Sequence, residues 1–266
     1  MCSSDLITRL FSLVLSAAAL FALGWQSPAV AQSWSAPSMK PVMVVELFTS
    51  QGCNSCPPAD ELLLELIKRQ EKDNLIVLGY HVDYWDYLGW TDTFAKPIAT
   101  ERQKGYIRPL RMQSVFTPQI VVGGRMQAIG SDREAVDRAI MQARSALPGG
   151  GARVGFDFRD NGETYLKVEA PIEPVRFDGA DVWLVLFAEP MTVAIMRGEN
   201  AGKTISYGNV VRNVIHLAKW DGLTTSFKLP SGNFAGDAAY CAAIVQMPNQ
   251  GPILGAARIA MKNGGY

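Results

Sequence analysis

Two cysteines separated by two residues lie between a predicted strand and a predicted helix. Of all features of the sequence, this one most restricts the folds that the chain can adopt. Residues 46–60 read ELFTSQGCNSCPPAD, in which a β-type run ends in a glycine turn before Cys53 and Cys56. A helix that begins here offers unpaired N–H groups and the positive end of its dipole, and both favour thiolate over thiol. Because the thiolate attacks disulfides, the motif predicts a thiol–disulfide site within an α/β unit.

The first 31 residues have the pattern of a secretory signal peptide. Arg9 precedes an apolar run from Leu10 to Leu23, and residues 29–31 read Ala-Val-Ala, a small-x-small cleavage site. The apolar run is too short for a membrane-spanning helix, so we expect cleavage after Ala31 and no stable membrane span afterwards. The mature protein is then predicted to be periplasmic or secreted, with an uncleaved N-terminal anchor as the alternative.

The net charge indicates which kinds of macromolecule the protein binds, and the position of the third cysteine of the mature chain indicates its role. The chain has 25 basic and 25 acidic side chains, and loss of residues 1–31 would remove one of each. A neutral chain has no electrostatic footprint for nucleic acid, so we expect exported client proteins or a redox partner protein instead, and no cofactor. Cys241 lies in the apolar run AAYCAAIV, which predicts an inert thiol in a buried strand.

The chain up to residue 147 predicts an α/β domain behind a short leader. Residues 32–41 are rich in Ser and Pro and are expected to be disordered. Residues 42–147 then follow the order strand, helix, strand, loop, helix, strand, strand, helix, which is typical of a central sheet with packed helices. The expected strands include 42–48, 75–80 and 115–124, and the expected helices are 58–70, 97–108 and 132–146.

The composition changes at the sequence PGGG, residues 148–151, where we place a domain boundary. Residues 148–266 consist of short alternating runs separated by turns, and they predict an antiparallel β-sandwich-like domain. A hairpin is expected at Asp160-Asn161-Gly162. The expected strands are 153–158, 164–170, 182–188, 192–196, 206–217, 224–229, 238–247 and 253–261.

Thr117-Pro118 is a second signal, because a proline that opens an interior strand is unusual. It makes sense if the peptide bond is cis and lies beside the CxxC motif. There, the backbone before the proline can pair with an incoming extended peptide. An ordinary proline in an edge strand is the alternative.

With these two signals, residues 42–146 resemble a thioredoxin-like domain. The resemblance implies that Cys53 is the exposed nucleophile, that Cys56 resolves the mixed disulfide, and that Pro118 is a cis-proline facing the pair. It also implies a buried carboxylate that takes the proton of the resolving cysteine. Glu46 lies on the matching strand, one residue further from the motif than usual, and a Glu that points to the sheet edge is the alternative.

Longer segments are similar to a bacterial family of exported thioredoxin-like proteins with a β-rich C-terminal half. They read ELFTSQGCNSCPPAD, YHVDYWDYLGW, FTPQIVVGG and RGENAGKT. The similarity covers nearly all of the mature chain and implies a fold and a site but no substrate. Compared with ordinary thioredoxins, Gly52 replaces a tryptophan, and Pro57 and Pro58 remove two N–H donors from the first helical turn.

The aromatic loop HVDYWDYLGW should leave the C-terminal end of the second strand, the edge where open α/β sheets form sites. His81 could hold or shuttle a proton near the first cysteine, and Asp83 could tune it. Trp85 and Trp90 could offer an apolar surface to an unfolded peptide. Aromatic packing between the two domains is the alternative.

Residues 198–204, GENAGKT, differ from a phosphate-binding loop because three residues separate the glycines instead of four, and a strand is expected to follow. The sequence favours a turn of the β-rich half, one that could approach the redox site.

The leading interpretation is an exported thiol–disulfide oxidoreductase that uses Cys53 and Cys56 on protein thiols and disulfides. One alternative is a ligand- or partner-binding module in which the disulfide is structural. Another is copper handling through both cysteines and His81, because soft thiolates suit Cu(I). A zinc site would need two further ligands, and the two histidines, His81 and His216, lie in different predicted domains, so no metal site is predicted.

Overall fold

A computed structural model describes residues 41–147, 151–171, 179–231 and 236–261. All of these residues belong to one compact unit. The predicted signal peptide, the leader up to residue 40 and residues 148–150 of the predicted domain boundary lie outside the described residues. Among the helices in the described ranges, none is both long and apolar enough to cross a membrane.

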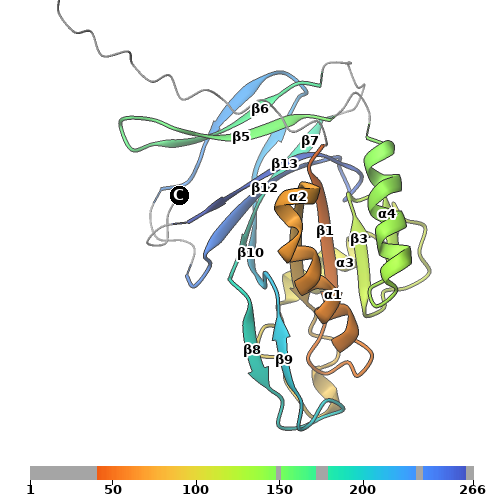
Figure 1. The fold of residues 1–266 in the computed structure, drawn as a ribbon. Coiled ribbons are helices and arrows are strands. Elements are labelled where there is room, and N and C mark those ends of the chain that lie inside the picture. The colour runs from red at the N-terminus through yellow and green to blue at the C-terminus, as the bar shows by residue number, and fades with distance from the viewer. Residues whose placement is uncertain (1–40, 148–150, 172–178, 232–235, 262–266) are drawn as a thin grey trace, which may run out of the picture. The chain divides into compact units, whose positions relative to one another are not determined.

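The N-terminal half is built on a four-stranded sheet with the order β2-β1-β3-β4. Strand β1 is parallel to β2 and antiparallel to β3, and β3 pairs with β4. The strands are β1 (Met43–Thr49), β2 (Leu75–His81), β3 (Gln119–Val122) and β4 (Met126–Ile129). The helices are α1 (Pro57–Lys68), α2 (Gln70–Asp73), α3 (Pro97–Gly105) and α4 (Arg133–Ser145), with a 3-10 turn η1 (Asp86–Leu88). Figure 1 shows β1 and β3 of this sheet beside the helices α1 and α4. The mixed α/β order predicted for this half is confirmed.

Strand β1 is buried along its whole length and contributes to two cores. Because side chains alternate along a strand, Met43, Val45 and Leu47 face helices α1 and α4. Val44 and Phe48 face the other way, toward the C-terminal half. A strand covered on both faces needs apolar residues on both, which explains the nearly continuous hydrophobic run that precedes the CxxC motif.

The C-terminal half is β-rich and consists of several antiparallel sheets (Figure 1). One sheet has the order β10-β7-β12-β13, a second has the order β11-β6-β5, and β8 pairs with β9. The first sheet shares one core with the second sheet and another with the N-terminal sheet, so its central strands are buried on both faces. The strands are β5 (Arg153–Phe158), β6 (Thr164–Glu169), β7 (Ala180–Phe187), β8 (Met191–Ala194), β9 (Thr204–Tyr207), β10 (Val211–Trp220), β11 (Thr225–Lys228), β12 (Tyr240–Gln246) and β13 (Ile253–Ala260).

The strand predicted at 206–217 is divided in the structure into β9 and β10. Gly208 lies against α1, where an added Cβ would overlap the end of the Ile67 side chain. Asn209 adopts a left-handed backbone with φ 45° and donates its Nδ2–H to the Val77 carbonyl at 2.8 Å. The chain turns here because it packs against the N-terminal half, a contact that strand periodicity does not encode.

Glu46 interrupts the apolar run of β1 and is compensated by a buried polar cluster. Arg102 donates from Nε to Glu46 Oε1 at 2.5 Å, and the Tyr106 hydroxyl donates to the other carboxylate oxygen. The Arg102 and Glu46 side chains are 3% and 0% exposed. Burial and the Glu46 charge raise the pKa of the Tyr106 phenol well above its usual range, which keeps it a donor. Arg102 also bonds Gln246 at the end of β12, so the cluster joins the two halves.

We expect Arg102→Met to lower the free energy of unfolding by about 3–5 kcal/mol, because it leaves the Glu46 carboxylate buried without its counter-ion. Urea unfolding at neutral pH measures the loss. The double variant Glu46→Gln/Arg102→Met removes both charges and should recover much of the stability. A single variant as stable as the double variant would contradict this explanation.

Candidate functional site

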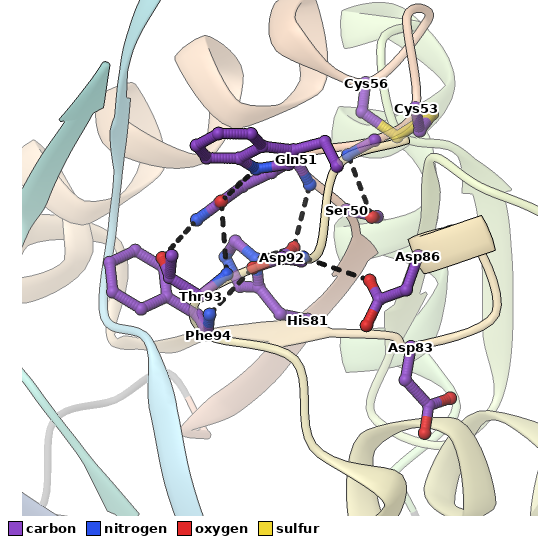
Figure 2. Close-up of polar contacts among 12 residues, drawn as sticks. Ser50, Gln51, Cys53, Cys56, His81, Asp83, Asp86, Asp92, Thr93 and Phe94 are labelled. Carbon is purple, nitrogen blue, oxygen red and sulfur yellow. Dashed lines mark hydrogen bonds and ion pairs between the residues drawn. A yellow bond between two sulfur atoms is a disulfide. The ribbon is translucent and has the colours of Figure 1, made fainter. Parts of the chain in front are cut away.

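Cys53 and Cys56 form a disulfide at the start of α1 (Figure 2). Cys56 is the N-cap residue of the helix, and Pro57 and Pro58 occupy its first positions. The prolines have no N–H, and the next two backbone N–H groups both donate to the Cys56 carbonyl. The helix dipole therefore acts on the motif, but residues 57–60 provide no free backbone N–H group to it: two of them are prolines and the other two donate to the Cys56 carbonyl.

Both cysteines are buried, with Cys53 2% exposed and Cys56 0% exposed. The two residues between them, Asn54 and Ser55, are exposed. The Ser55 hydroxyl lies 3.4 Å from Cys53 Sγ, where it can donate to a thiolate once the disulfide opens. The motif thus presents its central residues to solvent, with the Cys53 sulfur in contact with one of them.

The Thr117-Pro118 peptide bond is cis, as the sequence predicted, and β3 begins directly after it. Gly130 shows how closely this proline approaches the disulfide helix. A Cβ added at Gly130 would lie 3.0 Å from Ala59 Cβ and 3.1 Å from Pro118 Cβ. Pro118 therefore lies beside the first turn of α1.

Trp85 joins the motif to this proline segment. Its indole Nε1–H donates to Thr117 Oγ1 at 2.7 Å. A Cβ added at Gly52 would lie 3.2 Å from both Trp85 Cβ and the Trp85 carbonyl oxygen. A side chain at position 52 would be in tight contact with this tryptophan, which would have to shift slightly, and this gives a physical reason for glycine before the first cysteine.

His81 reaches the motif through Asp92, a residue that the sequence analysis missed (Figure 2). Asp92 Oδ2 lies 2.7 Å from His81 Nδ1 and accepts the Gln51 backbone N–H at 2.8 Å. Burial opposes ionisation of Asp92, but His81 and the backbone donors outweigh it and lower the pKa of this carboxyl. Asp92 is thus a buried carboxylate that fixes the backbone two residues before Cys53. No spacing in the sequence marks it as the partner of His81.

The buried Gln51 side chain links the motif to the end of the aromatic loop. Its Oε1 accepts the Trp90 indole N–H at 2.8 Å, and its Nε2 donates to Thr93 Oγ1 at 3.0 Å. Trp90 also lies against Gly198 of the C-terminal half, where an added Cβ would be 3.0 Å from Trp90 Cβ. The aromatic loop therefore packs between the motif and the second half, and its proposed contact with peptides stays a prediction.

Two predicted site residues lie apart from the disulfide. Asp83 Oδ1 accepts the Thr100 hydroxyl at 2.6 Å, and its carboxylate points away from the motif in Figure 2. Glu46 lies on the face of β1 opposite α1, paired with Arg102. The structure therefore brings together Cys53, Cys56, Trp85, Thr117 and Pro118, and it connects His81 indirectly.

Asp60 is a buried carboxyl that the sequence analysis did not single out. It lies one helical turn after Cys56 and is 2% exposed. Burial raises the pKa of Asp60 well above its ordinary value; the Thr49 hydroxyl opposes this shift and the Asp92 charge adds to it. Its Oδ2 has no hydrogen-bond partner among the described residues. An acid in a first helical turn is ordinarily an exposed, dipole-favoured residue, so the sequence carried no signal of this burial.

Asp60→Asn should make the protein more stable than the parent at neutral pH, with the difference disappearing in acid. Above about pH 4 an unfolded Asp loses its proton, whereas the buried Asp60 keeps its proton to a higher pH, so parental stability falls as pH rises between the two pKa values. The free energy of unfolding of the parent falls by at most about 1.4 kcal/mol per pH unit through this effect. Urea unfolding from acid to neutral pH measures it, with Asp160→Asn at an exposed position as the control. A constant difference between Asp60→Asn and the parent at all pH values would contradict the expectation.

The C-terminal half contacts the motif through the turn at residues 198–204. Asn200 donates from Nδ2 to the backbone carbonyls of Gln51 and Cys53, both at 2.9 Å. The expectation that this turn approaches the CxxC motif is confirmed. Within the part of the chain that the structure describes, no three or more His, Cys, Asp or Glu side chains are grouped to hold a metal ion.

Comparisons with known proteins place this architecture in a family without assigning an activity. A family model described as a protein of unknown function (DUF1223) matches residues 44–246, which span both halves. The structure is similar to the crystal structure of an Agrobacterium tumefaciens protein determined by a structural genomics consortium. The two are 36% identical with a TM-score of 0.69, over 84% of this chain and 96% of that chain. None of the curated proteins compared matches the chain.

A second solved structure, HBP35 of Porphyromonas gingivalis, is similar in fold. Its TM-score is 0.55 and its sequence identity 16%, over 86% of this chain and 77% of that chain. At this identity the likeness concerns the fold alone.

Proposed function

The chain belongs to the DUF1223 family of proteins of unknown function, and we propose that it is an exported, thioredoxin-like thiol–disulfide oxidoreductase. The observation that supports this most directly is the Cys53–Cys56 disulfide at the start of α1, with Pro118 beside the same helical turn. The sheet behind the motif, covered by α1 and α4 on one face and contacted by α3 on the other, supports the thioredoxin-like part of the proposal.

The proposed reaction moves two electrons between the motif and a client protein. In the oxidising direction a client thiolate attacks Cys53 Sγ, the Cys53–Cys56 bond breaks, and Cys56 leaves as a thiolate that takes up a proton. A second client thiolate then attacks the client sulfur of the mixed disulfide, and Cys53 leaves as a thiolate. The client gains a disulfide and the motif is reduced; the reverse sequence reduces a client disulfide.

The surroundings of the motif suit these proton movements. The dipole of α1 and the Ser55 hydroxyl both favour negative charge on Cys53. Asp60 follows Cys56 by four residues, so the two side chains share one side of the helix. Its raised pKa makes it a buried acid that can exchange a proton with the Cys56 thiolate.

The burial of Cys53 favours one second candidate, a binding module in which the disulfide is structural. A nucleophile at 2% exposure requires local movement before a client can reach it, whereas a structural disulfide requires none. The two candidates differ in the reactivity and in the redox equilibrium of the cysteine pair.

Cys56→Ser should accumulate mixed disulfides between Cys53 and client proteins, because the motif then has no second thiol to displace the client sulfur. Non-reducing electrophoresis of exported-protein extracts, followed by mass spectrometry, identifies the adducts. Cys53→Ser is the matched control, and both variants carry Cys241→Ser. Equal amounts of mixed disulfide in the two variants would contradict the assignment of Cys53 as the residue that bonds to the client. An absence of adducts, with Cys53 still open to a small alkylating reagent, would count against the oxidoreductase.

The reduction potential of the Cys53–Cys56 pair should lie in the range of known exchange proteins, roughly −120 to −270 mV. The mature chain carrying Cys241→Ser is equilibrated in graded glutathione buffers, alkylated, and weighed to count free thiols. A potential below about −300 mV would instead indicate a structural disulfide and support the binding module.

A further inference from the structure

Asn200 belongs to the C-terminal half but directs its hydrogen bonds to the CxxC motif. It lies in the loop between β8 and β9 and is 1% exposed. Its Nδ2 donates to the Gln51 and Cys53 carbonyls, each at 2.9 Å. Because these carbonyls flank Gly52, one amide group holds both ends of the turn that leads into the disulfide.

Asn200 is itself fixed by its own loop. Its Oδ1 accepts from Lys203 Nζ at 2.9 Å, and the Lys203 backbone N–H donates to the Asn200 carbonyl at 3.1 Å. The loop closes further through the Gly202 N–H and the Ile195 carbonyl, 2.8 Å apart. An ammonium group on the amide oxygen polarises the amide and strengthens its N–H groups as donors.

The first turn of α1 shows why additional positive charge near Cys53 matters. When the disulfide opens, a thiolate on Cys53 requires nearby donors or positive charge. Pro57 and Pro58 lack N–H groups, and the two N–H groups that follow donate to the Cys56 carbonyl. The helix therefore supplies less stabilisation than an ordinary helix N-terminus. The partial positive charge of the polarised amide, held at the Cys53 carbonyl, adds to this stabilisation without a hydrogen bond to the sulfur.

We propose that Asn200, polarised by Lys203, is a positioning residue of the redox site that holds the Cys53 backbone and favours its thiolate. It does not touch the reacting sulfur and transfers no proton; it acts through the Cys53 carbonyl and through the geometry of the preceding turn. The inference rests on the proposed function, because a positioning residue matters to the cell only if the cysteine pair exchanges disulfides. It makes the C-terminal half part of the redox site, through a residue 147 positions away in sequence.

The test measures the pH dependence of Cys53 alkylation by iodoacetamide in a Cys56→Ser/Cys241→Ser background. Asn200→Ala should shift the profile to higher pH and slow alkylation at neutral pH about fivefold, the effect of one ordinary hydrogen bond. Lys203→Met should act in the same direction but only about twofold, because the exposed charge is screened. Lys203→Arg keeps the cation and should retain the parental profile.

Asn209→Ala is the matched control. Asn209 is also buried, at 4% exposure, and also donates from the C-terminal half to an N-terminal carbonyl, that of Val77 within β2. Its left-handed backbone adds strain to the alanine variant, so this variant should lose at least as much stability as Asn200→Ala. Urea unfolding of each variant verifies that it folds and records its stability.

A shifted profile in Asn200→Ala with an unchanged profile in Asn209→Ala supports the proposal. Equal shifts in both variants, an unchanged profile in folded Asn200→Ala, or faster alkylation of that variant would overturn it. Alkylation needs no client protein, so this result is independent of the trapping experiment. A protein without clients can still show the Asn200 effect, and an active oxidoreductase can lack it.

Discussion

The burial of β1 on both faces is the constraint on which the rest of the structure depends. Helices α1 and α4 cover one face, and a sheet of the C-terminal half covers the other. The strand therefore delivers the turn before the cysteines into the interior, where backbone polar groups need partners. Asp92 accepts the Gln51 N–H, Ser50 accepts the Gly52 N–H, and Asn200 donates to the two carbonyls. The site is thus largely the set of groups that satisfies this buried turn.

Three buried carboxyl groups, those of Glu46, Asp92 and Asp60, have different polar partners in the interior of the protein. Glu46 has the guanidinium of Arg102 and a phenol as partners, so its environment is that of a buried ion pair. Asp92 has His81 and backbone donors, which lower its pKa despite burial. Within the described part of the chain Asp60 has no counter-ion at hydrogen-bond distance, and burial raises its pKa. A lowered pKa on Asp92 and a raised pKa on Asp60 are the kind of separation that lets neighbouring acids take different roles in proton transfer.

The sequence predicted features that depend on local chemistry. The order of elements in the N-terminal half, the cis bond at Thr117-Pro118, and the several short strands of the second half follow from periodicity and from Gly and Pro positions. The role assigned to Glu46 depended on the face of β1 on which its side chain lies, and a strand buried on both faces has no polar face to reveal that direction. Asp83 follows β2 in a loop, where strand periodicity gives no direction for the side chain. Asp92 and Asn200 carry no local signal because their partners are fixed by tertiary packing.

The two halves differ in sequence pattern, yet polar groups of both halves contact Cys53. An isolated CxxC helix can stabilise a thiolate when its first turn has free N–H groups. In this chain, prolines occupy the positions where two of those groups would stand, and the Cys56 carbonyl takes the next two. Side-chain donors near Cys53 include the Ser55 hydroxyl and, from the second half, the Asn200 amide. The family model matches residues 44–246, which include parts of both halves. In the proposed arrangement the C-terminal half covers one face of β1 and also holds the Asn200 amide against the motif.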